Sequence, residues 1–196
     1  MRRKGVAVIG LSVWLLAGTL GAQSHEGHHA PSHPYARTLE DYEVPEVTLL
    51  NQDREDVALR ELVSRDTPVM LDFIFATCTT ICPVMSAGFS GLQRELGDDA
   101  GKVQLISISI DPEHDKPEVM KKYLRRYKAK PGWQFLTGSR RDVETVMRAF
   151  DSYVPDKMSH RPLTFLRGPR QEQWVRIDGL IGSADLLKEY RDLLGP

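Results

Sequence analysis

The sequence predicts an α/β protein in which helices cover both faces of a mixed sheet. The mostly apolar run 69–75 is typical of a strand buried on both faces, and residues 103–110 give a second strand of this type. Stretches with helical spacing follow both runs, and a candidate β-hairpin and a last helix close the chain. Alternating strands and helices indicate parallel pairing, and the hairpin adds antiparallel strands.

Composition indicates one globular domain with an appendage. The chain has 196 residues, of which 41% are apolar and 27% are charged, and this profile excludes a disordered chain and a multi-span membrane protein. The formal net charge is −1, so no basic field attracts nucleic acid, and no nucleic-acid partner is expected. Two cysteines are too few for a disulfide-rich scaffold or a four-cysteine metal site.

Residues 1–22 are typical of an export signal. Three basic residues precede an uncharged, mostly apolar segment, residues 5–22, which ends at a plausible cleavage point after Ala22. The alternative is an uncut N-terminal membrane anchor, since eighteen residues lie at the short edge of what spans a bilayer of ~30 Å. Both interpretations predict a location outside the cytoplasm, periplasmic or otherwise extracytoplasmic, and an uncut segment would attach the protein to the inner membrane.

Residues 23–40 are predicted to be a disordered, His-rich linker, and residues 41–196 the folded domain. The linker has few large aliphatic side chains with which to offset chain entropy. Neutral imidazoles bind copper, zinc or nickel, so the linker could gather such ions; it could equally be a polar spacer. After cleavage at Ala22 the first of its histidines would be the third residue, a spacing that suits square-planar Cu(II). The linker histidines are His25, His28, His29 and His33.

The first half of the predicted domain contains short strands and a helix. Residues 44–50 and 57–59 are typical of strands around the polar turn 51–55. After the first buried strand a helix is predicted over residues 83–96, because Pro83 suits a first helical turn and apolar residues recur at helical spacing. These apolar residues are Met85, Phe89, Leu92 and Leu96.

The second half alternates helices with strands. Asp115 and Glu118 are spaced as in a capping box and predict a helix start after the second buried strand. A short strand, a helix and a loop follow, and the loop contains His160. The predicted ranges of the remaining elements are a strand at 133–136, a helix at 142–150, a hairpin at 163–166 and 173–177, and a helix at 183–194. This order of elements corresponds to the thioredoxin-like plan.

Cys78 and Cys82 form the candidate reactive centre. They lie between the carboxyl end of a buried strand and the start of a helix, where ligands bind in open α/β sheets. Residues four apart on a helix share a face, and the helix N-terminus favours thiolates, which are nucleophiles and soft-metal ligands. The pair could bind a metal, exchange disulfides or form a structural bridge. The bridge is disfavoured, because so short a loop constrains the unfolded chain little.

His160 is the candidate third donor. It precedes a predicted core strand, whereas the other five histidines lie in the linker or, like His114, in an acidic loop. Two thiolates and one imidazole are similar to the ligand set of thiolate copper sites. A single loop histidine is otherwise an ordinary solvated residue, so this assignment depends mainly on the resemblance that follows.

The chain resembles the Sco/SenC family of extracytoplasmic copper proteins over about residues 43–194. The resemblance rests on the strand leading into Cys-Thr-Thr-Ile-Cys-Pro at 78–83, on the segment 107–118, and on a histidine before the penultimate strand. It implies that Cys78, Cys82 and His160 bind one copper ion, as Cu(I), Cu(II) or both. It further implies a metallochaperone that helps to load the copper centre of cytochrome c oxidase. The implied partners are the oxidase subunit that holds this centre and a thiol reductant, and Asp111 is expected to lie near the site.

Four positions around the ligands keep a redox role open. Thr79, Ser159 and Arg161 stand where the family usually has Pro, Asp and Ser, which makes the site less negative and should weaken Cu(II) more than Cu(I). Pro162 precedes a strand, as does the cis-proline of thioredoxins. The alternative to a non-enzymatic chaperone is a thiol–disulfide oxidoreductase that uses Cys78 and Cys82 to keep a copper target's cysteines reduced.

Two observations disfavour enzyme functions. Three residues separate the cysteines, whereas thioredoxins have two. A peroxide-reducing enzyme, the third hypothesis, needs one low-pKa cysteine in an apolar pocket, and a cysteine pair does not favour it. The sequence therefore predicts a binding protein before an enzyme.

Overall fold

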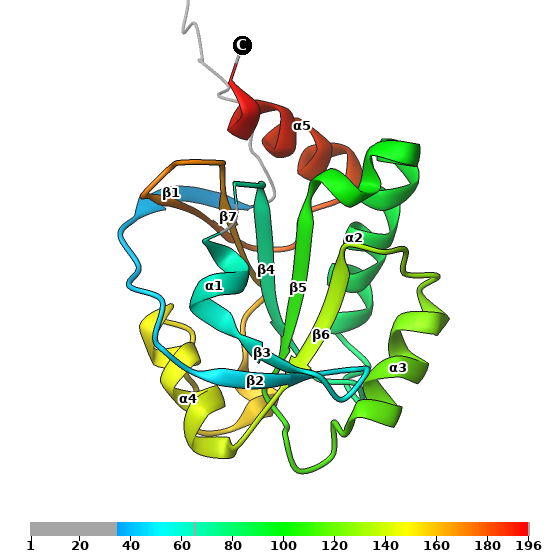
Figure 1. Ribbon diagram of the computed structural model, residues 1–196, viewed down its shortest axis with the longest axis vertical. Helices are drawn as coiled ribbons and strands as arrows, with labels where there is room; N and C mark the ends of the chain where they lie inside the picture. Colours follow the sequence, from blue (N-terminus) through cyan, green and yellow to red (C-terminus); the bar gives the residue numbers. More distant parts are fainter. Residues whose placement is uncertain (1–34, 65, 196) are drawn as a thin grey trace, which may run out of the picture. The chain divides into compact units, whose positions relative to one another are not determined.

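A mixed sheet of eight strands runs through the part of the chain that the computed structural model describes, residues 35–64 and 66–195 (Figure 1). All of these residues belong to one compact unit. The strand order is β1-β8-β7-β4-β5-β6-β2-β3. The strands are β1 (Ala36–Glu40), β2 (Thr48–Asn51), β3 (Asp56–Ala58), β4 (Val69–Ile74), β5 (Gln104–Ser109), β6 (Trp133–Thr137), β7 (Leu163–Arg167) and β8 (Trp174–Asp178).

Parallel and antiparallel pairing meet at β4. The strand pairs in parallel with β5, from Val69 opposite Gln104 to Ile74 opposite Ser109, and β5 pairs in parallel with β6. On its other side β4 pairs antiparallel with β7, which continues into β8 as a hairpin. The described residues of β4 are all buried, because strands flank it on both edges and helices cover both faces.

Helices pack on the two faces of the sheet, as Figure 1 shows for α3 and α4. On one face the ring of Phe89 in α2 lies 5.6 Å from that of Trp133 in β6. On the other, the Phe73 ring of β4 lies 6.0 Å from that of Phe150, which ends α4. The predicted sheet with helices on both faces is confirmed. The helices are α1 (Leu59–Val63), α2 (Cys82–Leu96), α3 (Pro117–Arg126), α4 (Arg140–Ala149) and α5 (Ser183–Leu194).

The contact between α2 and α5 depends on a residue without a side chain. A Cβ atom added at Gly91 of α2 would lie 2.5 Å from the Cβ of Ser183, the first residue of α5. Such a distance is far inside van der Waals contact, so the two helices approach each other this closely only because position 91 is glycine. Glycine at position 91 thereby lets α5 pack closely against α2.

The linker boundary that the sequence predicts at residue 40 needs correction. Ala36–Glu40 forms β1, an edge strand that pairs antiparallel with β8 from Ala36 opposite Asp178 to Glu40 opposite Trp174. Its side chains are mostly exposed, so no apolar pattern marks it in the sequence. Arg37 also donates to both carboxylate oxygens of the buried Glu189 in α5. The signal or anchor segment and the linker histidines lie outside the described residues.

Two further local predictions differ from the structure. The expected strand at 57–59 ends at Ala58, and α1 begins at Leu59, whose buried side chain fits a helix as well as a strand. The capping box before α3 is not formed. The N-cap is Lys116, which makes no side-chain capping bond. The Asp115 carboxylate, which the sequence predicts as the cap, is buried and accepts the Ser109 hydroxyl instead.

Within the described residues, the helices are either too short or too polar to cross a membrane.

We expect Phe150→Ala to lower the free energy of unfolding by about 3–5 kcal/mol. The ring is fully buried, and its centroid lies 5.0 Å from that of Phe165 and 5.1 Å from that of Trp174. Its removal costs apolar transfer energy and leaves a cavity in this aromatic cluster. Urea unfolding measures the change, with Leu39→Ala, at a side chain 56% exposed, as the control. A loss no larger than that of the control would contradict the packing described.

Candidate metal centre

The two cysteines lie in a turn that joins β4 to α2. Cys78 is in the loop after the strand, where its N–H donates to the carbonyl of Phe75 over 3.1 Å. Cys82 is the first residue of α2, and Pro83 follows it in the first helical turn. The cysteines therefore do not share a helix face, contrary to the prediction from their spacing. The loop folds back instead and brings Cys78 over the helix start. Both side chains are buried free thiols.

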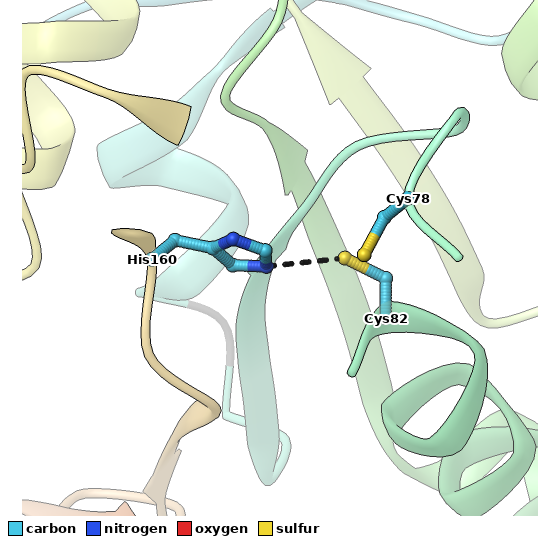
Figure 2. A group of neighbouring side chains, drawn as sticks. All are labelled: Cys78, Cys82 and His160. Carbon is cyan, nitrogen blue, oxygen red and sulfur yellow. Dashed lines mark hydrogen bonds between the residues drawn. The ribbon is translucent and has the colours of Figure 1, made fainter. Parts of the chain in front are cut away.

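His160 completes a cluster of three donors (Figure 2). It follows the short 3₁₀ turn η2 (Lys157–Ser159) and stands just before β7. Its Nε2 atom lies 3.3 Å from the Sγ atom of Cys82. One ligand atom from each of Cys78, Cys82 and His160 can be chosen so that all three lie within 4.8 Å of one another. The structure thus brings together the three residues that the sequence singled out.

A backbone carbonyl sets the tautomer of His160. The Nδ1 atom lies 2.6 Å from the carbonyl oxygen of Lys157. Because a carbonyl can only accept, Nδ1 carries the proton, and Nε2 is left with its lone pair toward the sulfur of Cys82, whose S–H donates to it. Burial lowers the pKa of His160, against the raising effect of this hydrogen bond, so the ring is neutral at pH 7. A neutral imidazole with a free Nε2 is the form that binds metals.

The two thiols differ in acidity. Burial raises the pKa of Cys82 well above its usual range, and the neighbouring Cys78 and Asp72 raise it further. Burial alone would raise the pKa of Cys78, but hydrogen bonds from the Thr80 hydroxyl and from the backbone of Thr80 and Cys82 outweigh it and lower the pKa of Cys78. At neutral pH Cys78 is therefore the more reactive sulfur and Cys82 the protected one.

The donor set fits copper. Two sulfurs and an imidazole are soft and borderline ligands, which select Cu(I) and zinc over hard cations. Within the described ranges this is the one group of three His, Cys, Asp or Glu residues placed to hold a metal ion. Because the sulfurs are buried, a bound ion would be shielded from most solvent. The cluster therefore supports copper binding.

Asp111 and Lys157 connect the cluster to the loop after β5. The Asp111 carboxylate is buried and accepts from the Lys157 ammonium and, over 2.9 Å, from Nδ1 of His114. Burial favours the neutral acid, but these two hydrogen bonds outweigh it and lower the pKa of Asp111. Asp111 was expected near the site from the resemblance. Sequence reasoning missed Lys157, whose partner stands 46 positions away in the chain.

Asp115 has a different role from the helix cap that the sequence predicts. Its buried carboxylate accepts the backbone N–H of Ala76 over 3.1 Å and the Ser109 hydroxyl over 2.6 Å. These bonds fix the start of the loop that carries Cys78. The only sequence signal was an acidic residue before a helix, and that signal pointed to capping.

Every described peptide bond is trans, including that of Pro162, so the similarity to the thioredoxin cis-proline does not extend to its isomer.

Asp72 lies in the middle of β4 beneath this centre. It alternates with Phe73 and so points to the face that α2 covers. The side chain is fully buried, and among the described residues neither carboxylate oxygen has a hydrogen-bond partner. Burial raises the pKa of Asp72 to about 7, although the nearby Ser107 hydroxyl acts in the opposite direction. The uncharged acid is therefore well populated at neutral pH.

Fold and site together define a class: a thioredoxin-like α/β domain with a buried Cys-Cys-His cluster at the carboxyl end of a central strand. The chain belongs to the SCO1/SenC family, whose sequence model matches residues 37–194. The family resemblance read from the sequence and the predicted thioredoxin-like fold are both confirmed.

Three similar proteins support this assignment. The SCO1 protein homolog of Bacillus subtilis is 38% identical over 136 residues, which are 65% of this chain and 69% of that protein. The structure of BsSco, described as a member of the Sco family of cytochrome c oxidase assembly proteins with a disulfide switch, superposes with a TM-score of 0.66 at 31% identity, covering 81% of this chain and 96% of that one. ScoI of Bradyrhizobium japonicum, solved with copper bound, superposes with a TM-score of 0.63 at 26% identity, covering 79% and 98%.

We expect Asp72→Asn to gain stability over the wild type as pH rises. The unfolded carboxyl titrates near about 3.9, whereas burial raises the pKa of Asp72 to about 7 in the folded state. Folding therefore takes up a proton between these values, and the free energy of unfolding of the wild type falls across this range. Between pH 5 and pH 8 the advantage of the variant should grow by roughly 2–3 kcal/mol in urea unfolding.

The exposed Asp98→Asn is the matched control, because its carboxylate stays solvated in both states. Parallel stability curves for the wild type and Asp72→Asn would contradict the raised pKa.

Proposed function

We propose that this chain is a metallochaperone that binds one copper ion through Cys78, Cys82 and His160. The observation that carries the proposal is the convergence of the three donor atoms within 4.8 Å, with the imidazole held in the tautomer that leaves Nε2 free. Copper entry would remove the thiol proton that Cys82 donates to Nε2 and leave both sulfurs as thiolates. The two protons would pass to solvent, so binding should be tighter at higher pH.

The proposed client is the copper centre of cytochrome c oxidase. BsSco is described as belonging to a family of assembly proteins for this oxidase, and ScoI of Bradyrhizobium japonicum holds copper in its structure. This chain has the same fold as both and contains a donor set suited to the same metal. A carrier with only three protein ligands leaves copper open to attack by a ligand of the client, which favours transfer.

The proposed location is outside the cytoplasm, periplasmic or otherwise extracytoplasmic, with residues 1–22 as a cleaved signal or an anchor in the inner membrane. In an oxidising compartment two neighbouring thiols form a disulfide, which removes both sulfur ligands. A thiol reductant is therefore a necessary partner. The histidines of residues 23–34 would gather copper ahead of the buried site.

We expect the reduced full-length protein to bind one Cu(I), and either Cys→Ser change to weaken binding at least about 100-fold, beyond the effect typical of an outer hydrogen-bond partner. Loss of one sulfur leaves a single soft ligand beside the imidazole. His160→Ala should weaken Cu(II) more than Cu(I), because the sulfurs dominate Cu(I) binding. Anaerobic titration against a Cu(I) chelator measures the affinities, with the linker histidines replaced by alanine in every protein.

The control is Lys121→Ala, because Lys121 is an exposed side chain whose ion-pair partner is Asp53 and not a residue of the cluster or of its surrounding network. The disulfide form of the protein should show no tight Cu(I) site. Native affinity in a single-cysteine variant, or in the disulfide form, would place the copper ligands elsewhere and reject the proposal.

The unequal thiols favour a second candidate function, thiol–disulfide exchange with a copper target. In such exchange the thiol of lower pKa attacks as a thiolate, and the second thiol resolves the mixed disulfide. The lowered pKa of Cys78 and the raised pKa of Cys82 match these two roles. The same pair could thus carry copper and keep the cysteines of its client reduced.

We expect a disulfide reagent at pH 7 to react first with Cys78, because its lowered pKa gives it a larger thiolate fraction than Cys82. Cys82→Ser should keep the fast reaction and trap a stable mixed disulfide, whereas Cys78→Ser should abolish it. Stopped-flow absorbance gives the rates, and mass spectrometry identifies the modified residue. Equal rates at the two sulfurs, or no catalysed reduction of a protein disulfide, would leave the copper function alone.

A further inference from the structure

We propose that Lys157 is a positioning residue of the metal centre: its ion pair with Asp111 is a latch that holds His160 against the two cysteines. The inference rests on the proposed copper function, and it assigns the placement of the third ligand to a residue outside the ligand set.

The turn that carries His160 has little else to hold it in place. None of the three residues of η2 is buried, and Met158 in its middle is 64% exposed. The turn closes on itself through Asp156, whose carboxylate accepts the N–H of Met158. Such local bonds shape the turn but do not attach it to the domain. Among the described contacts of η2, the Lys157 ammonium supplies the ion pair to the body of the protein.

Lys157 acts on His160 through both its ends. Its carbonyl accepts the Nδ1–H of the imidazole, and its ammonium bonds to Asp111. The ammonium also lies 5.2 Å from the centre of the Phe75 ring, and that ring meets the imidazole edge to face at 5.2 Å. Displacement of the side chain would therefore move the carbonyl that sets the tautomer and disturb the ring that bounds the imidazole.

The other half of the latch is fixed to the cysteine loop. The Asp111 N–H donates to Oγ of Ser109 over 3.0 Å, and Ser109 donates to Asp115, which accepts the N–H of Ala76. Ala76 stands two positions before Cys78. One hydrogen-bonded network thus runs from the loop of the first sulfur to the turn of the imidazole, and Lys157 closes it.

Solvent can reach the ion pair between Lys157 and Asp111 without unfolding of the domain. Asp111 and Lys157 both line a pocket of about 420 Å³ between α4 and the loops that follow β5 and α4. The Lys157 side chain is 35% exposed, whereas that of Asp111 is buried. The ion pair can therefore open from the lysine side, while the aspartate keeps its bonds to His114 and Ser109.

The test is Lys157→Met, which keeps the length and apolar stem of the side chain and removes the charge. We expect Cu(II) affinity to fall about 10–100-fold, with a changed thiolate-to-Cu(II) absorption band and a smaller change for Cu(I). Lys157→Arg should restore the native spectrum. Lys121→Met, which breaks the exposed ion pair between Lys121 of α3 and Asp53, is the matched control and should leave the spectrum unchanged.

A copper-free measurement separates the latch from the proposed function. In Lys157→Met, ¹⁵N relaxation should show residues 157–160 more mobile than in the wild type, and adding Asp111→Asn should increase that mobility little further. If the wild type binds no copper but this mobility appears, the copper function fails and the latch stands. A Met variant with native relaxation and a native Cu(II) band overturns the latch.

Discussion

The parallel pairing of β4 with β5, with β7 antiparallel on the other side of β4, determines where the metal centre lies. Because β4 and β5 run in the same direction, their carboxyl ends meet at one edge, with Ile74 opposite Ser109. Because β7 runs the opposite way, its start lies at that same edge, with Thr164 opposite Asp72. The cysteine loop, the acidic loop and the histidine turn therefore converge without any long excursion of the chain, and hydrogen bonds between these loops need only adjust their final positions.

The parts of this arrangement that leave a periodic or apolar pattern could be predicted from the sequence. The buried strands, the helix after Cys82 and the histidine before β7 were each visible in local residue order. Strand β1 was not, because an edge strand with exposed side chains resembles a linker. Cys78 was placed on a helix face, since spacing alone does not tell a helical turn from a folded loop. The partners of Lys157 and Asp115 lie 46 and 39 positions away, and no local pattern encodes such pairs.

The centre combines ligands with different degrees of freedom. Cys82 is held by the first turn of α2 and is the most deeply buried of the three donors, so it is the fixed point. Cys78 is held by loop hydrogen bonds, and His160 by a turn that is attached chiefly through side chains. This order, from rigid sulfur to adjustable imidazole, suits the proposed role of accepting an ion and releasing it again. It also explains how one cysteine pair can have one reactive and one protected member.

The edge strand β1 gives the domain a mechanical property. A pull on the residues before Tyr35 reaches β1 first, through its five register pairs with β8 and through Arg37, which is bonded to Glu189. The strands that support the ligands, β4 and β7, lie further in, and β8 separates β7 from β1. Force would therefore peel β1 away while the ligand-bearing strands keep all of their mutual pairing. A tether at the N-terminal side can transmit load to the domain without straining its metal centre.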